Sequence, residues 1–210
     1  MTMNDYKREF LLHLVGTGAI KFGSFRLKSG RLSAYFINIA DAMRTGKDAL
    51  KVADVYVKKI EEAKINFNFI YGIAYKGISL AALIAMRYAQ KGIDVRWGYN
   101  RKMEKDHGEG GMIVGDIQRG DRVLIVDDVI SSGFTKLESW LKLDYSFEDI
   151  KPAGVLVGVD REEMDNGYRK RFEEYGLCIY SILSASDIFD YIGGKYDCNK
   201  IGRYDSSECG

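Results

Sequence analysis

The stretch from Val123 to Thr135 constrains the fold more than any other part of the sequence. Its first four residues, Val-Leu-Ile-Val, form an unbroken aliphatic run, which is typical of a strand buried on both faces in a parallel sheet. Two aspartates close the run, and polar and apolar residues alternate at roughly helical spacing from Lys136 to Leu143. The loop between them carries Ser131, Ser132, Gly133 and Thr135. A strand, a small-residue loop and a helix start together predict an anion pocket of backbone N–H groups and hydroxyls.

The two aspartates, Asp127 and Asp128, indicate which anion this pocket takes. A nucleoside-triphosphate loop carries a lysine beside its glycines, and no lysine stands within this loop. Carboxylates repel phosphate but accept hydrogen bonds from a sugar diol, so the pattern favours a ribose 5-phosphate. The loop would bind the phosphate, and the acids would bind the 2- and 3-hydroxyls. Two alternatives stay open at this point: the pair binds Mg²⁺, or it is a solvated strand end.

Composition excludes several classes of protein. The chain has 210 residues, of which 46% are hydrophobic, and its net charge is +1. This length suits one α/β domain with a full core, and the near-neutral charge predicts neither a nucleic-acid partner nor an acidic membrane surface. The three cysteines have no metal-like spacing, and their odd number argues against a disulfide framework and for the reducing cytoplasm. No apolar run approaches the ~20 residues of a membrane span.

Hydrophobic spacing predicts alternating strands and helices, the pattern of a parallel α/β sheet. We expect helices over residues 3–15, 46–64, 78–91, 136–143, 164–175 and 186–192. We expect strands over residues 33–39, 69–73, 95–99, 123–126, 153–159 and 177–183, after a short-stranded segment at 16–27. From Gly193 onward the chain is polar and glycine-rich, and we expect a frayed tail over residues 193–210.

Further cationic side chains follow predicted strands or turns. Lys28 and Arg31 flank a Ser-Gly turn, which indicates either an anion clamp or a solvated hairpin turn. Lys76 and Arg161 each follow a predicted strand, at the end where open α/β sheets bind ligands. For Lys76 a solvent-facing side chain is the alternative.

Residues 100–111 have no apolar periodicity, but they hold three glycines and four potentially cationic groups, at Arg101, Lys102, Lys105 and His107. A lid that closes on a polyanion has this composition, and so does a disordered surface loop. Because the segment lies between two predicted strands, we favour the lid, over residues 100–112.

Several of these segments occur together in a known family. The Asp127-Asp128 loop resembles the phosphoribosyl-diphosphate signature of type I phosphoribosyltransferases. In the same order along residues 5 to 192, the chain resembles the orotate phosphoribosyltransferases of that family, and the 105–110 run Lys-Asp-His-Gly-Glu-Gly is the most specific match. The other matching segments are Leu27-Lys28-Ser29-Gly30-Arg31, Tyr75-Lys76-Gly77, Arg101-Lys102 and Asp160-Arg161.

The resemblance implies a role for each matching residue. It implies Lys105, His107 and Asp128 as catalytic residues. It implies binding of phosphoribosyl diphosphate by Lys28, Tyr75, Lys76, Arg101, Lys102, Lys105, His107, Asp127, Asp128, Val129, Ile130, Ser131, Ser132, Gly133, Phe134 and Thr135. It implies orotate binding by Lys28, Phe36, Ile37, Ser131 and Arg161. Mg²⁺ would be the cofactor, held through the substrate with no direct protein ligand.

The resemblance also implies the architecture. We expect one domain over residues 1–192, with a central, mostly parallel sheet flanked by helices and a small hood from about residues 1–40 and C-terminal segments. We expect a homodimer in which the lid reaches the neighbouring subunit's site. The sequence departs from the family at Ala34, often proline, at Ile37, often aromatic, and at Phe134, usually a small hydroxyl residue.

Two other functions remain to be weighed. A ligand-sensing regulator of the same fold is expected to carry a basic nucleic-acid face or an added DNA-binding domain, and neither is evident. A purine salvage transferase would keep the ribose-phosphate loop without the Lys-Asp-His-Gly-Glu-Gly run.

Overall fold

The computed structural model describes residues 3–26, 32–105 and 111–193. Its centre is a six-stranded sheet with the order β5-β4-β3-β6-β7-β8. These strands are β3 (Phe69–Gly72), β4 (Arg96–Lys105), β5 (Gly111–Val114), β6 (Arg122–Ile130), β7 (Lys151–Asp160) and β8 (Ile179–Ser184). All neighbouring strands are parallel except β4 and β5, which are antiparallel. The expected α/β fold with a mostly parallel sheet is confirmed.

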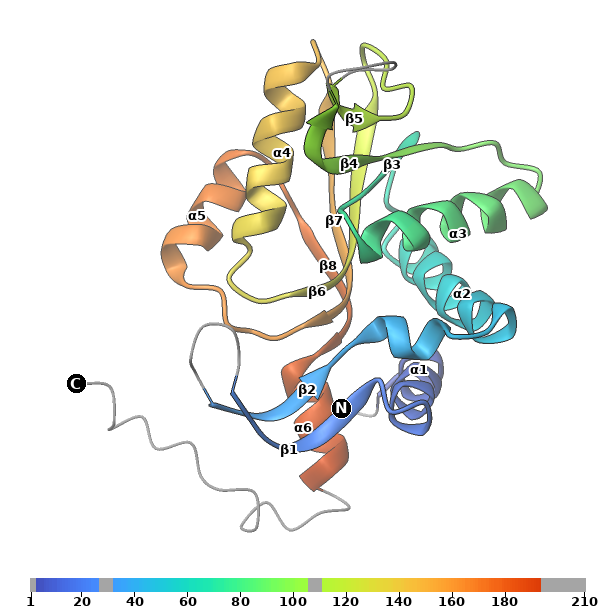
Figure 1. Cartoon of the computed structure of the whole chain (residues 1–210), viewed down its shortest axis with the longest axis vertical. Coiled ribbons are helices and arrows are strands. Elements are labelled where there is room, and N and C mark those ends of the chain that lie inside the picture. The colour runs from blue at the N-terminus through green and yellow to red at the C-terminus, as the bar shows by residue number, and fades with distance from the viewer. Residues whose placement is uncertain (1–2, 27–31, 106–110, 194–210) are drawn as a thin grey trace.

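Helices cover both faces of this sheet (Figure 1). On one side lie α2 (Gly46–Glu62) and α3 (Lys76–Gln90), and on the other lie α4 (Phe134–Ser146) and α5 (Asn166–Glu174). Along β6, Leu124 and Val126 belong to the core under α2 and α3, whereas Val123 and Ile125 belong to the core under α4. The aliphatic run is therefore buried on both faces, as a central parallel strand requires.

The N-terminal elements pack beside one end of the sheet (Figure 1). They are α1 (Asp5–Gly16), the antiparallel pair β1 (Ile20–Arg26) and β2 (Leu32–Ile37), and the 3-10 helix η1 (Ile39–Met43). The last helix, α6 (Ala185–Gly193), returns to this group, where the rings of Phe189 and Tyr35 meet edge to face at 5.5 Å. This arrangement corresponds to the expected hood, built from both ends of the chain.

Short polar side chains fix where several helices begin. The Thr45 hydroxyl accepts the Asp48 N–H at 3.2 Å, the Asp165 carboxylate accepts the Tyr168 N–H at 2.9 Å, and the Ser184 hydroxyl accepts the Asp187 N–H at 3.0 Å. Such caps satisfy N–H groups that have no partner within the helix. No helix within the described residues is long and apolar enough to cross a bilayer.

One segment differs from expectation. We expected a lid loop over residues 100–112, but β4 continues to Lys105, and residues 111 and 112 belong to β5. Asn100 pairs with Ile113, and Lys105 pairs with Gly111. The expectation is wrong for these residues because pairing with a neighbouring strand overrides their weak local β-preference. Residues 106–110, and with them His107, lie outside the described residues.

Candidate active site

The acidic pair lies where the connections of the sheet diverge. From β3 the chain runs through α3 on one face to β4, and from β6 it runs through α4 on the other face to β7. Neighbouring strands whose connections leave on opposite faces form a crevice at their carboxyl ends, where α/β proteins bind ligands. Lys76 follows β3, Asp127 and Asp128 lie near the end of β6, and Arg161 follows β7. The site residues of these three strands therefore share one edge of the sheet.

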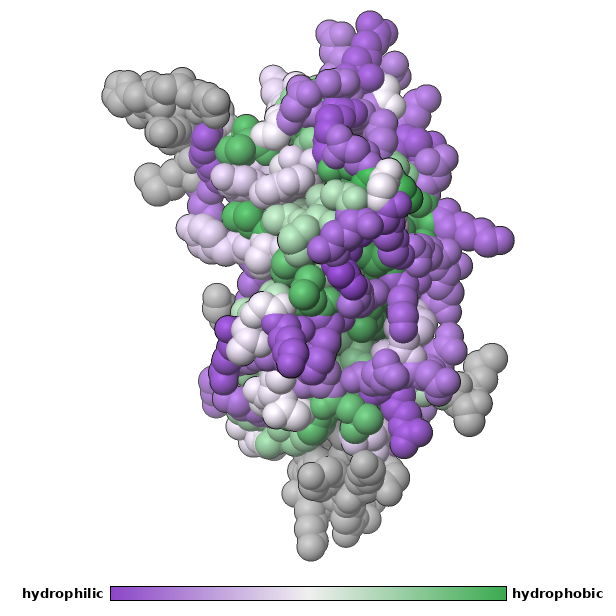
Figure 2. Space-filling model, turned by 90° about the vertical axis from the view of Figure 1, so that its right-hand side faces the viewer, coloured by the Kyte–Doolittle hydropathy of each residue, from purple (hydrophilic) through white to green (hydrophobic). Residues whose placement is uncertain are grey.

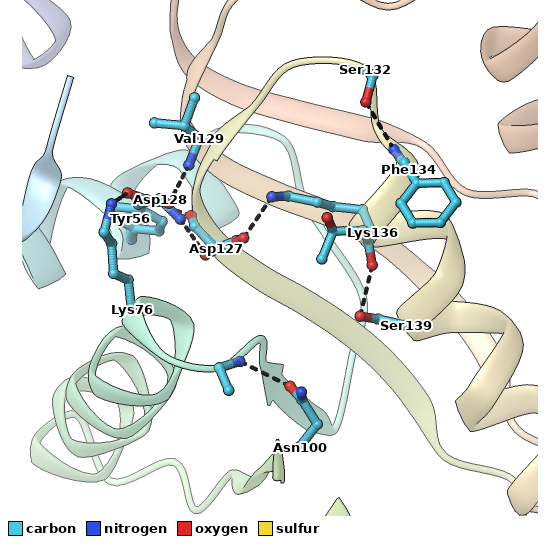
Figure 3. Close-up of polar contacts among 12 residues, drawn as sticks. Tyr56, Lys76, Asn100, Asp127, Asp128, Val129, Ser132, Phe134, Lys136 and Ser139 are labelled. Carbon is cyan, nitrogen blue, oxygen red and sulfur yellow. Dashed lines mark hydrogen bonds and ion pairs between the residues drawn. The ribbon is translucent and has the colours of Figure 1, made fainter. Parts of the chain in front are cut away.

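Two lysines approach the acidic pair from opposite sides (Figure 3). The Lys76 Nζ lies 2.5 Å from Asp128 Oδ2, and the Lys136 Nζ lies 2.5 Å from Asp127 Oδ2. The aspartates are only 8% and 7% exposed. Burial raises the pKa of Asp127, and the Lys136 ammonium acts against that rise by favouring the carboxylate.

Backbone groups orient both carboxylates. Asp127 Oδ1 accepts the N–H of Asp128, and Asp128 Oδ1 accepts the N–H of Val129, each at 2.9 Å. The hydroxyl of the fully buried Tyr56 donates to the Asp127 carbonyl oxygen at 3.0 Å. Each carboxylate is thus held by a lysine on one oxygen and by an N–H on the other. Four lone-pair positions per carboxylate leave acceptor capacity for ligand hydroxyls.

The loop after β6 leads directly into the N-terminus of α4. Gly133 has the left-handed φ of +82° and its carbonyl accepts the N–H groups of Lys136 and Leu137, each at 3.0 Å. The first N–H groups of a helix lack intrahelical partners and carry partial positive charge, so they suit an anion. The Phe134 side chain is 54% exposed and meets Tyr168 edge to face at 6.4 Å, instead of contributing a hydroxyl to the loop.

We predict that Gly133→Ala destabilises the protein more than Gly120→Ala does. Both glycines have a φ near +83°, which costs an alanine about 1–2 kcal/mol. A Cβ at Gly120 meets open space, whereas a Cβ at Gly133 clashes with the side chains of Met164 and Phe172. Urea unfolding should show a free energy of unfolding lower by a further ~1–3 kcal/mol for Gly133→Ala. Equal losses in the two variants would contradict tight packing under the loop.

The turn after β3 brings Tyr75 and Lys76 beside β4. A Cβ on Gly77 would collide with the Val126 carbonyl, so a glycine lets α3 begin close against β6. The Ala74 N–H donates to Asn100 Oδ1 at 2.8 Å, and the Lys102 Nζ lies 4.5 Å from the centre of the Tyr75 ring. Tyr75 is 68% exposed. Tyr75, Lys76 and Lys102, which are all predicted ligand residues, therefore lie close together.

Arg161 is held in a fixed orientation at the end of β7. Its Nε and Nη2 donate to Glu163 Oε1 at 3.0 and 2.9 Å, and its Nη2 donates to Ser33 Oγ at 3.1 Å. The guanidinium lies 4.7 Å over the ring of Tyr35. The Arg161 N–H donates to the Ile130 carbonyl at 2.9 Å, which ties this residue to the end of β6. These bonds use the Nε hydrogen and both Nη2 hydrogens, so a ligand carboxylate would bind Nη1 or replace Glu163 at the fork.

The structure does not bring every predicted residue together. Phe36 is 41% exposed and packs on Phe25, whereas Ile37 is 8% exposed and belongs to the core, because successive strand residues point to opposite faces. Arg101 donates to the Gly111 carbonyl at 2.9 Å, across the β4–β5 hairpin. Lys28 and His107 lie outside the described residues, and only the backbone of Lys105 is described.

Sequence reasoning missed four residues that shape the site: Tyr56, Asn100, Lys136 and Glu163. Lys136 had a usable signal, because it comes three residues after the loop glycine, in the first turn of the helix. No lysine stands within the loop, but this lysine just after it is long enough to reach the acids. Within the described residues, no three or more His, Cys, Asp or Glu side chains form a group able to hold a metal ion.

Comparisons with known proteins agree with this geometry. The phosphoribosyl transferase domain model matches residues 43–161. The orotate phosphoribosyltransferase of Neisseria meningitidis serogroup C is 44% identical over 191 residues, which are 89% of this chain and 88% of that protein. The orotate phosphoribosyltransferase of Marinobacter nauticus is 40% identical over 195 residues and 90% of each chain.

Solved structures give the same result. The crystal structure of orotate phosphoribosyltransferase from Francisella tularensis has a TM-score of 0.76 and 30% identity to this chain, over 96% of this chain and 93% of that one. The matched domain spans the acidic pair, the loop and Arg161. The chain therefore belongs to the phosphoribosyltransferase family, among its orotate phosphoribosyltransferases.

Proposed function

We propose that this protein transfers the 5-phosphoribosyl group from 5-phosphoribosyl 1-diphosphate to orotate, giving orotidine 5'-phosphate and diphosphate in pyrimidine biosynthesis. The observation that carries the proposal is the cluster of charged side chains at the carboxyl ends of β3, β6 and β7. It combines an acidic pair, a helix-start loop and a fixed arginine fork. Family membership and 40–44% identity to orotate phosphoribosyltransferases support the same activity.

The ribose 5-phosphate end of the donor fits the β6–α4 junction. Asp127 and Asp128 would accept hydrogen bonds from the 2- and 3-hydroxyls, because an ionised carboxylate is an acceptor only. The 5-phosphate would bind the N-terminus of α4, with Val129 and Ile130 leading into the loop. The loop residues assigned to the phosphate are Ser131, Ser132, Gly133, Phe134 and Thr135. Phe134 would contribute its backbone N–H, since its ring packs beside Tyr168.

The base would lie between the hood and the end of β7. Arg161 would bind the orotate carboxylate through paired hydrogen bonds, a geometry that an ammonium group cannot reproduce. Ser33, whose hydroxyl already accepts from Arg161, belongs to the hood strand β2. We assign Ser131, Lys28 and Phe36 to the same ligand. Ile37 contributes through the backbone of β2, because its side chain is buried in the core.

The reaction separates charge, and we assign the cationic side chains to the negative charge that develops on the diphosphate. Loss of diphosphate from ribose C1 leaves positive charge on the sugar and adds negative charge to the leaving group. Cations placed where charge develops accelerate such a step. The cations that we assign to the diphosphate are Lys28, Lys76, Arg101, Lys102, Lys105 and His107. Mg²⁺ bound through the diphosphate would share this neutralisation, and we assign no residue of this chain as its direct ligand.

We further propose a homodimer with shared active sites. Three large apolar side chains are exposed near α3 and β4. Met86 on α3 is 41% exposed, Ile93 just after α3 is 51% exposed, and Trp97 on β4 is 39% exposed. Figure 2 views the side of the molecule where α2 and α3 lie, and it shows apolar residues gathered in the middle of that face. Apolar surface of this kind suits a second copy of the chain. The β4–β5 hairpin would then carry the lid toward the neighbouring site.

Mixing two inactive variants tests the sharing of sites. Lys105→Ala and Asp128→Asn should each have little activity alone. In a mixed dimer with shared sites, one site combines an intact Lys105 with an intact Asp128. Refolding the two together should therefore restore up to about one quarter of wild-type activity, the share expected for random C2 pairing. Activity that stays at the level of the separate variants would show that each subunit uses its own Lys105.

A substrate panel tests the proposed function itself. Purified protein, Mg²⁺ and 5-phosphoribosyl 1-diphosphate are incubated separately with orotate, uracil, adenine or hypoxanthine, and loss of each base is followed. We expect consumption of orotate alone, with release of one diphosphate per base consumed. Activity on a purine alone would make the protein a salvage transferase. Binding of phosphoribosyl diphosphate without turnover of any base would favour a ligand-sensing regulator.

A further inference from the structure

Lys136 is a buried cation that has no assigned role in the proposed reaction. It lies in the first turn of α4, its side chain is 10% exposed, and its Nζ reaches Asp127 at 2.5 Å. Figure 3 shows its side chain running back from the helix toward the end of β6. A buried ion pair loses the solvation of both charges, and apolar residues of similar volume often stabilise a fold as well. The presence of this pair is therefore better explained by the site than by the fold.

The two lysines at the acidic pair differ in how exposed their side chains are, and therefore in how readily they can change partner. The side chain of Lys76 is 40% exposed, so it is free to exchange Asp128 for a substrate phosphate. The side chain of Lys136 is 10% exposed and packs under the loop, so it stays with Asp127. One ion pair is thus exchangeable and the other is fixed. The donor substrate brings several negative charges beside two carboxylates, and a fixed cation cancels one of these carboxylates throughout.

The contacts of Asp127 show what the fixed cation does. Lys136 holds Oδ2, the Asp128 N–H holds Oδ1, and the Tyr56 hydroxyl holds the carbonyl of the same residue. The carboxylate is therefore held at two points, from α4 and β6, and the backbone of the same residue is held at a third, from α2. Asp128 is the nearest like charge, and its own cation is the exchangeable Lys76. Without Lys136, Asp127 would lose its counter-charge and one of the two hydrogen bonds that orient its carboxylate.

We propose that Lys136 is a positioning residue for the phosphoribosyl donor: it holds Asp127 ionised and oriented to accept a ribose hydroxyl, without touching the substrate itself. This inference rests on the proposed function. It assigns Lys136 a role through Asp127 alone, and not through the phosphate in the neighbouring loop. Burial opposes the charged form of Asp127, which is why a dedicated cation is needed.

The test replaces Lys136 by methionine, which has a similar length and no charge, and by glutamine as a second uncharged variant. Calorimetry with phosphoribosyl diphosphate and Mg²⁺ should show binding weakened about 10- to 100-fold, the loss expected for a charged hydrogen-bond partner. KM for orotate at saturating donor should stay within about twofold of wild type, as expected for a site that keeps its contacts. Lys136→Arg should recover part of the affinity. The matched control is Lys142→Met, on the same helix, whose side chain is 58% exposed and pairs with Glu138.

A double-variant cycle shows whether Lys136 acts through Asp127. In an Asp127→Asn background, Lys136→Met should change donor affinity less than about twofold, because the residue through which it acts is already neutral. An equal loss in both backgrounds would mean direct contact with phosphate and would overturn the proposal. Unchanged donor affinity in folded Lys136→Met, with only a lower Tm, would reduce the lysine to a structural role and would also overturn it.

Measurements on the wild-type protein distinguish a failure of the Lys136 role from a failure of the proposed function. If wild type binds the donor but turns over no base, the proposed transfer fails, while the cycle still reports on Lys136. If wild type consumes orotate and the Lys136 variants bind the donor normally, the proposed transfer stands and the role of Lys136 fails.

Discussion

Replacing Lys105 with alanine is expected to lower kcat by about 10²-fold or more, the usual cost of removing one group that stabilises transition-state charge. KM for orotate should change little, because we assign the lysine to the leaving diphosphate and not to the base. Lys105 is the last residue of β4 and pairs with Gly111 of β5, so the hairpin carries it to the start of the lid segment. Steady-state kinetics with both substrates varied provides the measurement.

Two companion variants make this result specific. Lys170→Ala removes an exposed lysine from α5, which covers the face of the sheet opposite α2 and α3, and should leave kcat unchanged. Lys105→Arg keeps a positive charge and should retain more activity than alanine. If Lys105→Ala keeps the wild-type kcat, Lys105 has no part in stabilising the leaving group, and the catalytic charge comes from other cations.

The central sheet was predictable because its signal is local and strong. The aliphatic run from Val123 to Val126 is typical of a strand covered on both faces, and Leu124 and Ile125 accordingly lie in different cores. The acidic pair and the loop were predictable for a related reason. Carboxylates directly after such a strand, with small residues before a helix, have few uses other than binding a ligand.

The hairpin of β4 and β5 was not predictable in the same way. Residues 100–105 show no alternation of apolar side chains, and their strand exists because backbone groups pair with β5. Pairing between segments depends on tertiary context, which a single stretch of sequence does not contain. Asn100 illustrates this, since its role is to accept the N–H of Ala74 from a different strand–helix turn.

Lys136 was missed because helical patterning assigns charged residues to the exposed face. The pattern from Lys136 to Leu143 places the lysine outward, yet its side chain folds back under the loop to Asp127. A long side chain at the first turn of a helix reaches the preceding strand end, because side chains tilt toward the helix N-terminus. Charge pairs between a strand end and the next helix are therefore worth testing in any sequence with paired acids before such a loop.

Arg161 offers the sharpest test of base recognition. Its guanidinium is oriented by Glu163, Ser33 and the ring of Tyr35, and a paired contact with orotate would replace Glu163 at Nε and Nη2. Two charge-assisted hydrogen bonds to orotate are worth about 3–4 kcal/mol together. Arg161→Ala should therefore lower kcat/KM for orotate by about 10²- to 10³-fold.

The conservative variant decides whether charge or geometry matters at this position. Arg161→Lys keeps the positive charge but loses the fork, and we expect KM for orotate to rise at least about tenfold, because an ammonium group makes no planar paired contact. The affinity for phosphoribosyl diphosphate should stay near that of wild type in both variants, since the proposed donor site lies at the end of β6. Arg171→Ala, an exposed arginine on α5, is the matched control and should change neither constant. A lysine variant with a wild-type KM would mean that the site attracts the base by charge alone, and an equal loss of donor affinity would place Arg161 at the donor instead.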